Sequence, residues 1–349
     1  MKPALSEALQ RALSRWQNCA PCPGSNVAII DGRHGAWSGA AGWRDPDGET
    51  AMPDGARFYI YSITKSFVAA RLLQLGIALD RPISAYLPSP ALPDGVTVRR
   101  LLNHSAGLPS YTDQPDYAPA ARRAPGQPWT DEEVFRRCLG GALDFSPGDG
   151  WRYSNTGYLL LKRLLETVAG ATLAEAIGAG ILGPLGLAES YVAQAIDKGR
   201  LTPGYTRELS TDERMIDVMP IYHPGWCLTG VMVSTAAEVA RFYAALMGGK
   251  LLPPAALATM TDPMPTGFAG DRFYRRPCYG LGLMIDPDWG HGGLYGHGGG
   301  GPGASSWAMH LPDFHGRPVT LVALCNASWG GHPHFLMKDL LRVLEEEEA

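Results

Sequence analysis

Ser62 and Lys65 stand three residues apart at the start of a predicted helix over residues 64–75. Side chains at this spacing lie on one helix face, so the lysine amine can reach the serine hydroxyl. A serine hydroxyl becomes a nucleophile only when a neighbouring base takes its proton. The backbone N–H groups at a helix N-terminus also favour a developing oxyanion. In isolation, however, a capping serine and a surface lysine explain this short pattern more simply.

A second cluster contains Tyr153 and Asn155, just before a predicted helix over residues 158–168. The phenol of Tyr153 can act as a general base if a nearby cation lowers its pKa. The carboxamide of Asn155 can hold a substrate carbonyl or amide. Taken alone, the same residues would form an ordinary turn before a helix.

The third cluster is His297 followed by four glycines at 298–301, which we place just ahead of a strand. Glycines at a strand edge let a ligand approach the backbone closely and leave N–H groups available. A flexible loop with an incidental histidine is the simpler alternative. A phosphate-binding loop does not fit, because no strand, glycine loop, Gly-Lys-Ser/Thr and helix follow in that order.

Together, SxxK, YxN and HxG in this order resemble the serine β-lactamase and penicillin-binding-protein superfamily. The similarity is to its class C β-lactamase-like branch, which includes DD-peptidases, D-aminopeptidases and β-lactamase-like carboxylesterases. The segments 101–109, 184–187 and 231–236 also resemble that branch, and the resemblance runs from about residue 27 to residue 327. It implies an α/β (α+β) fold: an antiparallel β-sheet flanked by N- and C-terminal helices, with an inserted, mostly helical domain.

The resemblance implies a serine acyl-enzyme mechanism. Ser62 attacks a carbonyl carbon, and the ester intermediate is resolved by water or another nucleophile. Either Lys65 or Tyr153 can be the formal base, since a coupled pair titrates as a pair. The backbone N–H groups of Ser62 and Gly300 would form the oxyanion hole.

Substrate-binding roles are implied for Asn155, His297, Gly298 and Gly299. His297 stands where β-lactamases usually carry lysine, and Gly298 where they carry threonine. An imidazole with an ordinary pKa of about 6.5 is mostly neutral at pH 7, so it recognises a carboxylate weakly. We therefore expect weak or no β-lactamase activity, and hydrolysis of esters, amides or short peptides, as in carboxylesterases or D-amino-acid peptidases and amidases.

Three alternatives remain beside this interpretation. An acyltransferase would use the same acyl-enzyme with an alcohol or amine as acceptor. A non-catalytic ligand-binding protein on the same fold would not need the full set of reactive residues. An α/β-hydrolase with Ser105 as nucleophile is improbable, because Asn103 replaces the first glycine of its motif and residues 98–102 are predicted to be helical.

Patterning along the chain fits two domains. We expect a sheet domain from residues 1–79 and 232–349, a helical domain from 80–231, and the active site in the cleft between them. Predicted helices cover residues 1–16, 64–75, 236–247 and 334–344, and a solvated tail is expected at 345–348. Capping-box patterns place two further helix starts at Thr130 and Thr172 and mark the start of the 236–247 helix at Thr235. Predicted strands cover residues 26–30, 35–43, 57–61, 279–285, 305–311 and 319–324.

Composition limits the remaining classes. The chain has 349 residues and a net charge of −4, without the basic excess of nucleic-acid-binding proteins. No apolar run approaches the 18–20 residues, roughly, of a membrane helix, and we expect a cytoplasmic protein without an export signal. We expect no cofactor. We also expect no metal, because His332 and His334 are the only histidines with ligand-like spacing and no cluster of carboxylates or cysteines accompanies them. The cleft is expected to be lined by aromatic residues: Tyr111, Tyr117, Trp129, Tyr222, Trp226, Phe273 and Tyr274.

Overall fold

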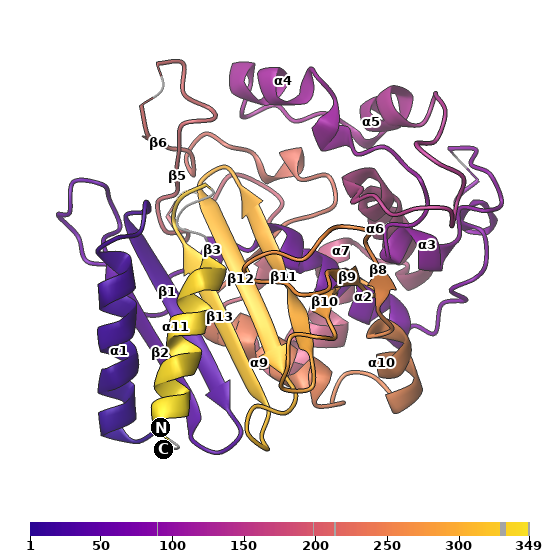
Figure 1. Ribbon diagram of the computed structural model, residues 1–349. Coiled ribbons are helices and arrows are strands. Elements are labelled where there is room, and N and C mark those ends of the chain that lie inside the picture. The colour runs from indigo at the N-terminus through magenta and orange to yellow at the C-terminus, as the bar shows by residue number, and fades with distance from the viewer. Residues whose placement is uncertain (89, 198, 213, 329–332, 348–349) are drawn as a thin grey trace.

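An antiparallel sheet of eight strands forms one side of the molecule (Figure 1). The computed structural model describes residues 1–88, 90–197, 199–212, 214–328 and 333–347. The strand order is β2-β1-β13-β12-β11-β10-β9-β8. The strands are β1 (Gly24–Asp31), β2 (Gly35–Gly42), β8 (Met264–Pro265), β9 (Cys278–Tyr279), β10 (Met284–Asp286), β11 (Leu294–Gly301), β12 (Ala304–Leu311) and β13 (Val319–Cys325). β1 therefore lies between β2, at the edge of the sheet, and the last strand β13, so strands from both ends of the chain meet in this sheet.

Helices cover both faces of this sheet. α1 (Pro3–Gln17) and α11 (Pro333–Glu346) lie side by side on one face, and α9 (Ala236–Met247) packs against the other (Figure 1). In α1 the buried residues Leu5, Leu9 and Leu13 recur every four positions, which places them on one side of the helix. That side and the apolar side of α11 bury one face of the sheet. The predicted fold class is confirmed.

The chain between the two parts of the sheet is mostly helical. Its main elements are η1 (Tyr61–Ile63), α2 (Thr64–Gln74), α3 (Val98–Leu102), η3 (Tyr111–Asp113), α4 (Tyr117–Arg123), α5 (Asp131–Cys138), α6 (Asn155–Ala169), α7 (Leu173–Ile177), η4 (Gly178–Leu182) and α8 (Gly183–Leu185). Shorter elements are η2 (Ile83–Ala85), η5 (Pro224–Trp226), β3 (Phe58–Tyr59), β4 (Tyr191–Val192), β5 (Tyr205–Thr206), β6 (Ile216–Asp217), β7 (Met232–Ser234) and α10 (Pro254–Met260).

Helix α2 lies at the centre of the largest apolar core. Its Phe67 stacks on Phe242 of α9, with ring centroids 3.6 Å apart, and the same core contains Leu160 of α6 and Val322 of β13. Because α2 packs against both the sheet helix α9 and the helical region, the first turn of α2 is fixed between the two parts. The division into domains at residues 80 and 231 stays a prediction.

The predicted helix starts are confirmed. Thr130, Thr172 and Thr235 each accept a hydrogen bond from the backbone N–H three residues later, which satisfies a free donor of the first turn. At Thr172 the side chain of Glu175 returns a bond to the threonine backbone, completing a capping box.

Two strand predictions were wrong in detail. Residues 279–285 do not form one strand: β9 and β10 are an antiparallel pair, and Gly282 lies in the turn between them with φ of +74°. The glycine segment after His297 does lie just ahead of a strand, β12, but it is itself in a strand, because it forms the end of β11, which pairs with β12 from Tyr295 to Gly301. Backbone pairing along β12 holds this segment extended even though glycine has a low intrinsic preference for strands.

Other boundaries also differ. The strand predicted at 57–61 is limited to β3, because η1 begins at Tyr61. The tail predicted at 345–348 is helical as far as Glu346, where α11 still lies beside α1, and Lys2 pairs with Glu347 at 3.3 Å. Residues 332 and 348 lie outside the described residues.

Among the described residues, no single helix has the length and apolarity needed to cross a membrane. α6 together with residues 173–185 passes that test only as a pair bent by 73°.

A buried ion pair at the end of β1 generates a prediction about stability. Arg317 Nε donates to both carboxylate oxygens of Asp31, at 2.9 and 3.0 Å, and both side chains are almost fully buried. Removing one partner of such a pair costs about 3–5 kcal/mol. We therefore expect Asp31→Ala to lower the free energy of unfolding by about that amount in urea titrations. The matched control is Asp80→Ala, which breaks an exposed pair with Arg99 and should cost at most about 1 kcal/mol. Equal losses would contradict this account.

Candidate active site

Ser62 lies in η1, the short turn that leads from β3 into α2. Tyr61 has a left-handed backbone, with φ of +44°, and its hydroxyl donates to the carbonyl of Pro302. Thr64 accepts a hydrogen bond from the backbone N–H of Met232 at 3.0 Å, which fastens α2 to β7. These contacts fix the half-buried Ser62 at the N-terminal end of α2. A non-glycine residue with positive φ is strained, and such strain clusters at functional sites.

Lys65 lies in the first turn of α2, three residues after Ser62, and is 2% exposed. Its Nζ donates to Ser62 Oγ at 3.0 Å and to Asn155 Oδ1 at 2.8 Å. None of the described carboxylates forms an ion pair with it. Burial therefore lowers the pKa of Lys65 to about 7. At neutral pH a large fraction of this amine is uncharged and able to take the Ser62 proton.

Tyr153 lies on the other side of Lys65, with Nζ 4.9 Å from the centre of its ring. Burial raises the pKa of Tyr153 above its ordinary value, and the nearby Ser62 hydroxyl only partly opposes this shift. The phenol oxygen has no hydrogen-bond partner of normal geometry among the described residues. At neutral pH the phenol stays protonated, so it is placed to donate a proton rather than to remove one.

Asn155 is the first residue of α6, and both ends of its side chain are engaged. Its carbonyl oxygen accepts from Lys65, and its Nδ2 donates to Thr112 Oγ1 at 3.1 Å. Its backbone N–H donates to Ser110 Oγ at 3.1 Å. Asn155 therefore orients the Lys65 amine. It also lines both of the cavities that open beside Ser62. The supporting hydroxyls of Thr112 and Ser110 belong to no motif, and sequence reasoning missed them.

β11 passes unusually close to η1. A Cβ atom on Gly299 would lie 2.2 Å from the carbonyl oxygen of Ile60, so only glycine allows this approach. β10 pairs with β11 only as far as Gly296, which leaves the following residues facing η1 along that edge. Gly300 and Ser62 consequently share the walls of the same cavities. That their N–H groups form the oxyanion hole stays a prediction.

The side chain of His297, a residue of β11, is buried and does not line either cavity beside Ser62. Its Nε2 lies 2.7 Å from the hydroxyl of Tyr279, and its Nδ1 contacts the carbonyl oxygen of Gly298. Burial, with a smaller contribution from the Lys65 charge, lowers the pKa of His297 to about 3. The imidazole is therefore neutral. It lines neither cavity beside Ser62, whereas Gly298 and Gly299 line the larger one, so direct substrate binding by His297 stays a prediction.

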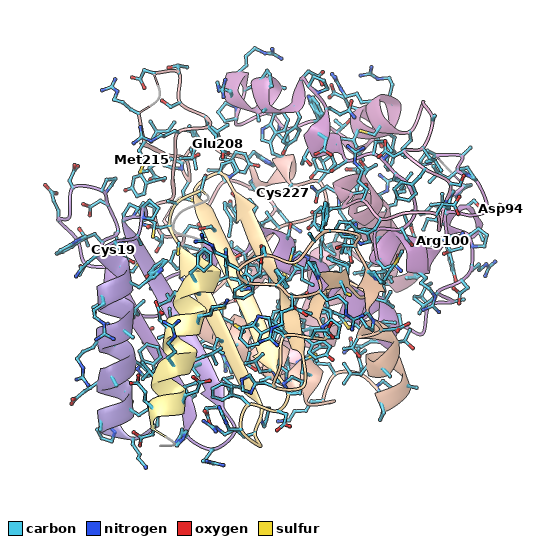
Figure 2. The ribbon with its side chains drawn as sticks, viewed as in Figure 1. Cys19, Asp94, Arg100, Glu208, Met215 and Cys227 are labelled. Carbon is cyan, nitrogen blue, oxygen red and sulfur yellow. The ribbon has the colours of Figure 1, made fainter. Side chains whose placement is uncertain are left out.

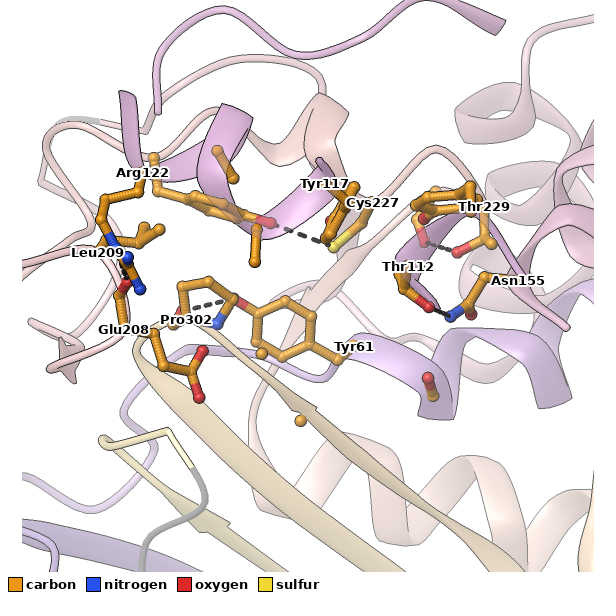
Figure 3. A pocket seen from close by; sticks show the side chains of 18 residues that line it. Tyr61, Thr112, Tyr117, Arg122, Asn155, Glu208, Leu209, Cys227, Thr229 and Pro302 are labelled. Atoms are coloured by element: carbon orange, nitrogen blue, oxygen red, sulfur yellow. Dashed lines mark hydrogen bonds between the residues drawn. The ribbon is translucent and has the colours of Figure 1, made fainter. Parts of the chain in front are cut away.

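Two cavities meet at Ser62, Thr112, Asn155 and Gly300. The first, of about 370 Å³, extends from Asn155 and Thr112 past the Tyr61 ring to Arg122 and Glu208 (Figure 3). Figure 2 shows Glu208 and Cys227 in the segments above the ends of β11 and β12. The second cavity is about 530 Å³ in volume, and its lining includes Asp113, Tyr153, Met284, Trp307 and His334.

The aromatic lining was predicted only in part. Tyr111, Tyr117 and Tyr222 line the first cavity. Trp129 and Trp226 lie behind Tyr117, with ring centroids 5.5 and 5.6 Å from it. Phe273 and Tyr274 pack on Trp307 at the α11 face of the sheet, so they line neither cavity. Sequence alone could not separate these groups, because all are large and apolar.

His104 holds the backbone around Tyr153. Its Nδ1 accepts from the N–H of Ser154 at 3.1 Å, and its carbonyl oxygen accepts from the N–H of Arg152 at 3.1 Å. Its ring packs on the Tyr153 ring, with centroids 4.2 Å apart. Burial and the nearby Lys65 charge lower the pKa of His104, so the ring is neutral with its proton on Nε2. His104 thereby fixes both sides of the residue that carries the phenol.

The model of the beta-lactamase family matches residues 17–345. The chain belongs to the beta-lactamase family. Family membership agrees with the arrangement of Ser62, Lys65, Tyr153 and Asn155, and it confirms the resemblance drawn from the three sequence clusters.

Curated relatives of this family member carry several activities in their names. It is 26% identical to Penicillin-binding protein 4* of Bacillus subtilis over 77% of this chain and 60% of the relative. It is 33% identical to Esterase EstB of Burkholderia gladioli over 46% of this chain and 45% of that protein. A D-aminopeptidase of Gluconobacter oxydans is 28% identical over 55% of this chain. The chain spans about half of the length of the first two relatives.

Several solved structures match nearly the whole chain. A D-stereospecific amidohydrolase from Streptomyces sp. is 32% identical, with a TM-score of 0.80, over 95% of this chain and 97% of that one. The D-amino acid amidase of Ochrobactrum anthropi SV3, complexed with D-phenylalanine, is 25% identical. Its TM-score is 0.82 over 99% of both chains.

The Lys65 environment generates a prediction about pH. Because a protonated amine cannot accept the Ser62 proton, kcat/KM should fall about tenfold per pH unit below a pKa of about 7 and level off above it. Ester hydrolysis measured from pH 5 to 9 tests this in the unmodified enzyme. A profile that is flat across pH 7 would exclude the amine as the base.

A pair of variants tests the role of His104. His104 has φ of +65°, a conformation that both asparagine and glycine tolerate. His104→Asn keeps an acceptor at the δ position, whereas His104→Gly removes it. We expect kcat to fall about 10–100-fold in the glycine variant, because a small displacement of Tyr153 misaligns proton transfer, and to be largely retained in the asparagine variant. Equal losses in two folded variants would show that the acceptor is not what matters.

Proposed function

We propose that this beta-lactamase-family protein is a serine amidohydrolase that cleaves amides and esters of D-amino acids. The observation that carries the proposal is the buried hydrogen-bonded group of Ser62, Lys65 and Asn155, open to two cavities. The match over nearly full length to a D-stereospecific amidohydrolase supports the substrate class.

The reaction follows from the positions of these groups. The Lys65 amine takes the Ser62 proton while Ser62 Oγ bonds to the carbonyl carbon, and the N–H groups of Ser62 and Gly300 bind the oxyanion. Cleavage of the C–N bond releases the leaving amine, which receives a proton from Tyr153, and the phenol regains one from Lys65. Water then attacks the ester by the same route, releasing the acid and restoring Ser62.

The cavities support a substrate with an apolar group next to the reacting carbonyl. The aromatic rings of Tyr61, Tyr111, Tyr117 and Tyr222 surround the first cavity, where a bulky apolar side chain can be buried. The neutral His297 provides no positive charge for a carboxylate, which supports weak or no β-lactamase activity.

Carboxylesterase activity is the second candidate, favoured by the similarity to Esterase EstB. An ester reacts through the same acyl-enzyme and needs less help with its leaving group. Transfer of the acyl group to an added alcohol or amine stays open as an alternative fate of the intermediate.

A substrate panel tests the proposal: D- and L-phenylalanine amide, p-nitrophenyl butyrate, and nitrocefin. We expect the D-amide to be cleaved at least tenfold faster than the L-amide, ester cleavage to be measurable and nitrocefin turnover to be poor.

Ser62→Ala should abolish hydrolysis and labelling by a fluorophosphonate, whereas Ser105→Ala, at the serine of the rejected α/β-hydrolase motif, should retain both. Cleavage of the ester alone would favour the esterase. Binding without turnover would favour the non-catalytic alternative. Repeating the panel with added methanol or glycine amide measures acyl transfer.

Tyr153→Phe tests the proton donor. Because the substitution keeps the ring that packs on His104 and removes only the hydroxyl, we expect kcat on the D-amide to fall about 10²–10⁴-fold with little change in stability. A smaller loss is expected for p-nitrophenyl butyrate, whose leaving group does not need the proton. Near-normal amide cleavage would remove Tyr153 from the mechanism.

A further inference from the structure

Three potential metal ligands converge at the end of the sheet away from Ser62. They are His291, in the connection from β10 to β11, His315, in the turn from β12 to β13, and Glu345, in the last turn of α11. One ligand atom from each lies within 4.8 Å of the other two. β11 runs from this end towards Gly300, and β12 returns, so the length of these strands separates the cluster from the active site.

The spacing of these atoms is close to that of a metal site. His315 Nε2 and Glu345 Oε1 are 3.7 Å apart, too far for a hydrogen bond. Two donors on one tetrahedral zinc ion lie about 3.3 Å apart, given metal–ligand distances of about 2.0–2.1 Å. Small side-chain rotations would therefore close the set. Within the described part of the chain, no hydrogen bond occupies the ring nitrogens of His291 or His315.

The scaffold holds both imidazoles near each other before any ion is bound. The backbone N–H of Asp313 donates to the carbonyl of His291 at 2.9 Å, which joins the two strand connections. The His291 ring packs on Phe314, with centroids 4.8 Å apart, and lies 5.2 Å from the His315 ring. Both histidines have left-handed backbones, with φ of +52° and +51°. Their side-chain directions are thus set by the turns.

The basic residues that precede Glu345 on α11 are directed elsewhere. Lys338 donates to the carbonyl of Arg272, and Arg342 donates to Asp339 at 3.0 Å. Neither forms an ion pair with the Glu345 carboxylate among the described residues, so that carboxylate can serve as a ligand.

We propose that His291, His315 and Glu345 bind a divalent transition-metal ion of the zinc type. Two imidazoles and one carboxylate suit zinc better than calcium or magnesium, which prefer oxygen ligands. A water molecule would complete the tetrahedron. The ion would connect the last turn of α11 to two strand connections, so its effect is on stability and not on the chemistry at Ser62. This proposal departs from the sequence-based expectation of no metal, which rested on spacing along the chain, because the three ligands come from distant segments.

The test uses the untagged full chain after a chelator has removed any bound metal. Calorimetric titration with zinc chloride alone then measures whether the protein binds zinc. We expect one zinc ion per chain with a Kd in the micromolar range or below. At a zinc concentration of about 100 Kd, Tm should rise by about 4 °C. Ester hydrolysis should be unchanged by the chelator, because the site is remote from Ser62.

Single variants identify the ligands. His291→Asn, His315→Asn and Glu345→Gln should each weaken zinc binding at least tenfold and remove the rise in Tm; asparagine tolerates the left-handed backbone of the two histidines. Glu346→Gln, on the next residue of the same helix, is the matched control and should bind zinc as the unmodified protein does. Absence of saturable binding below about 1 mM, or binding unchanged in both histidine variants, would overturn the proposal.

Discussion

The site depends on the burial of the Lys65 amine, with which no carboxylate of the described residues forms an ion pair. An ammonium in this position is hydrogen-bonded to the Ser62 hydroxyl and the Asn155 carbonyl and lies over the Tyr153 and Tyr158 rings, but all of these partners are uncharged. Burial therefore disfavours the charged form and lowers the pKa of Lys65 to about 7. Adding a buried carboxylate would restore the charge and remove the base. The surroundings of Lys65 therefore have to be both polar enough to hold the amine and poor in negative charge.

That requirement explains why the site is assembled from separate parts of the fold. η1 supplies Ser62 and the start of α2 supplies Lys65. The start of α6 supplies Asn155, and the segment before α6 supplies Tyr153, which His104 holds in place from a further segment. Each support is a backbone N–H, a hydroxyl, an amide or a neutral imidazole. The same neutrality extends to His297, whose proton-free ring nitrogen receives the hydroxyl of Tyr279.

The reactive group and the specificity are carried by different surfaces. In the proposed mechanism the group at Ser62 would attack carbonyl compounds of several classes, and the similar proteins include an esterase, a D-amino acid amidase and a D-aminopeptidase. In the proposed function the substrate would be selected by the two cavities, whose walls come from η3, α4, the segment around Cys227 and the glycine edge of β11. The opposite end of β11 and β12, where we propose a zinc site, lines neither cavity.

Short-range patterns determined much of this protein from its sequence. The spacing of Ser62 and Lys65, the threonine caps and the apolar repeat of α1 depend on neighbours within one or two helical turns, and each led to a confirmed element. The order of the three clusters was enough to indicate the family. Tertiary structure decided what depends on contacts between distant segments: the extended glycines of β11, the cavity to which each aromatic ring belongs, and the hydrogen bonds by which His104 holds the backbone on both sides of Tyr153. The lowered pKa of Lys65 and the convergence of His291, His315 and Glu345 belong to this second group, since burial and proximity arise only when the segments pack together.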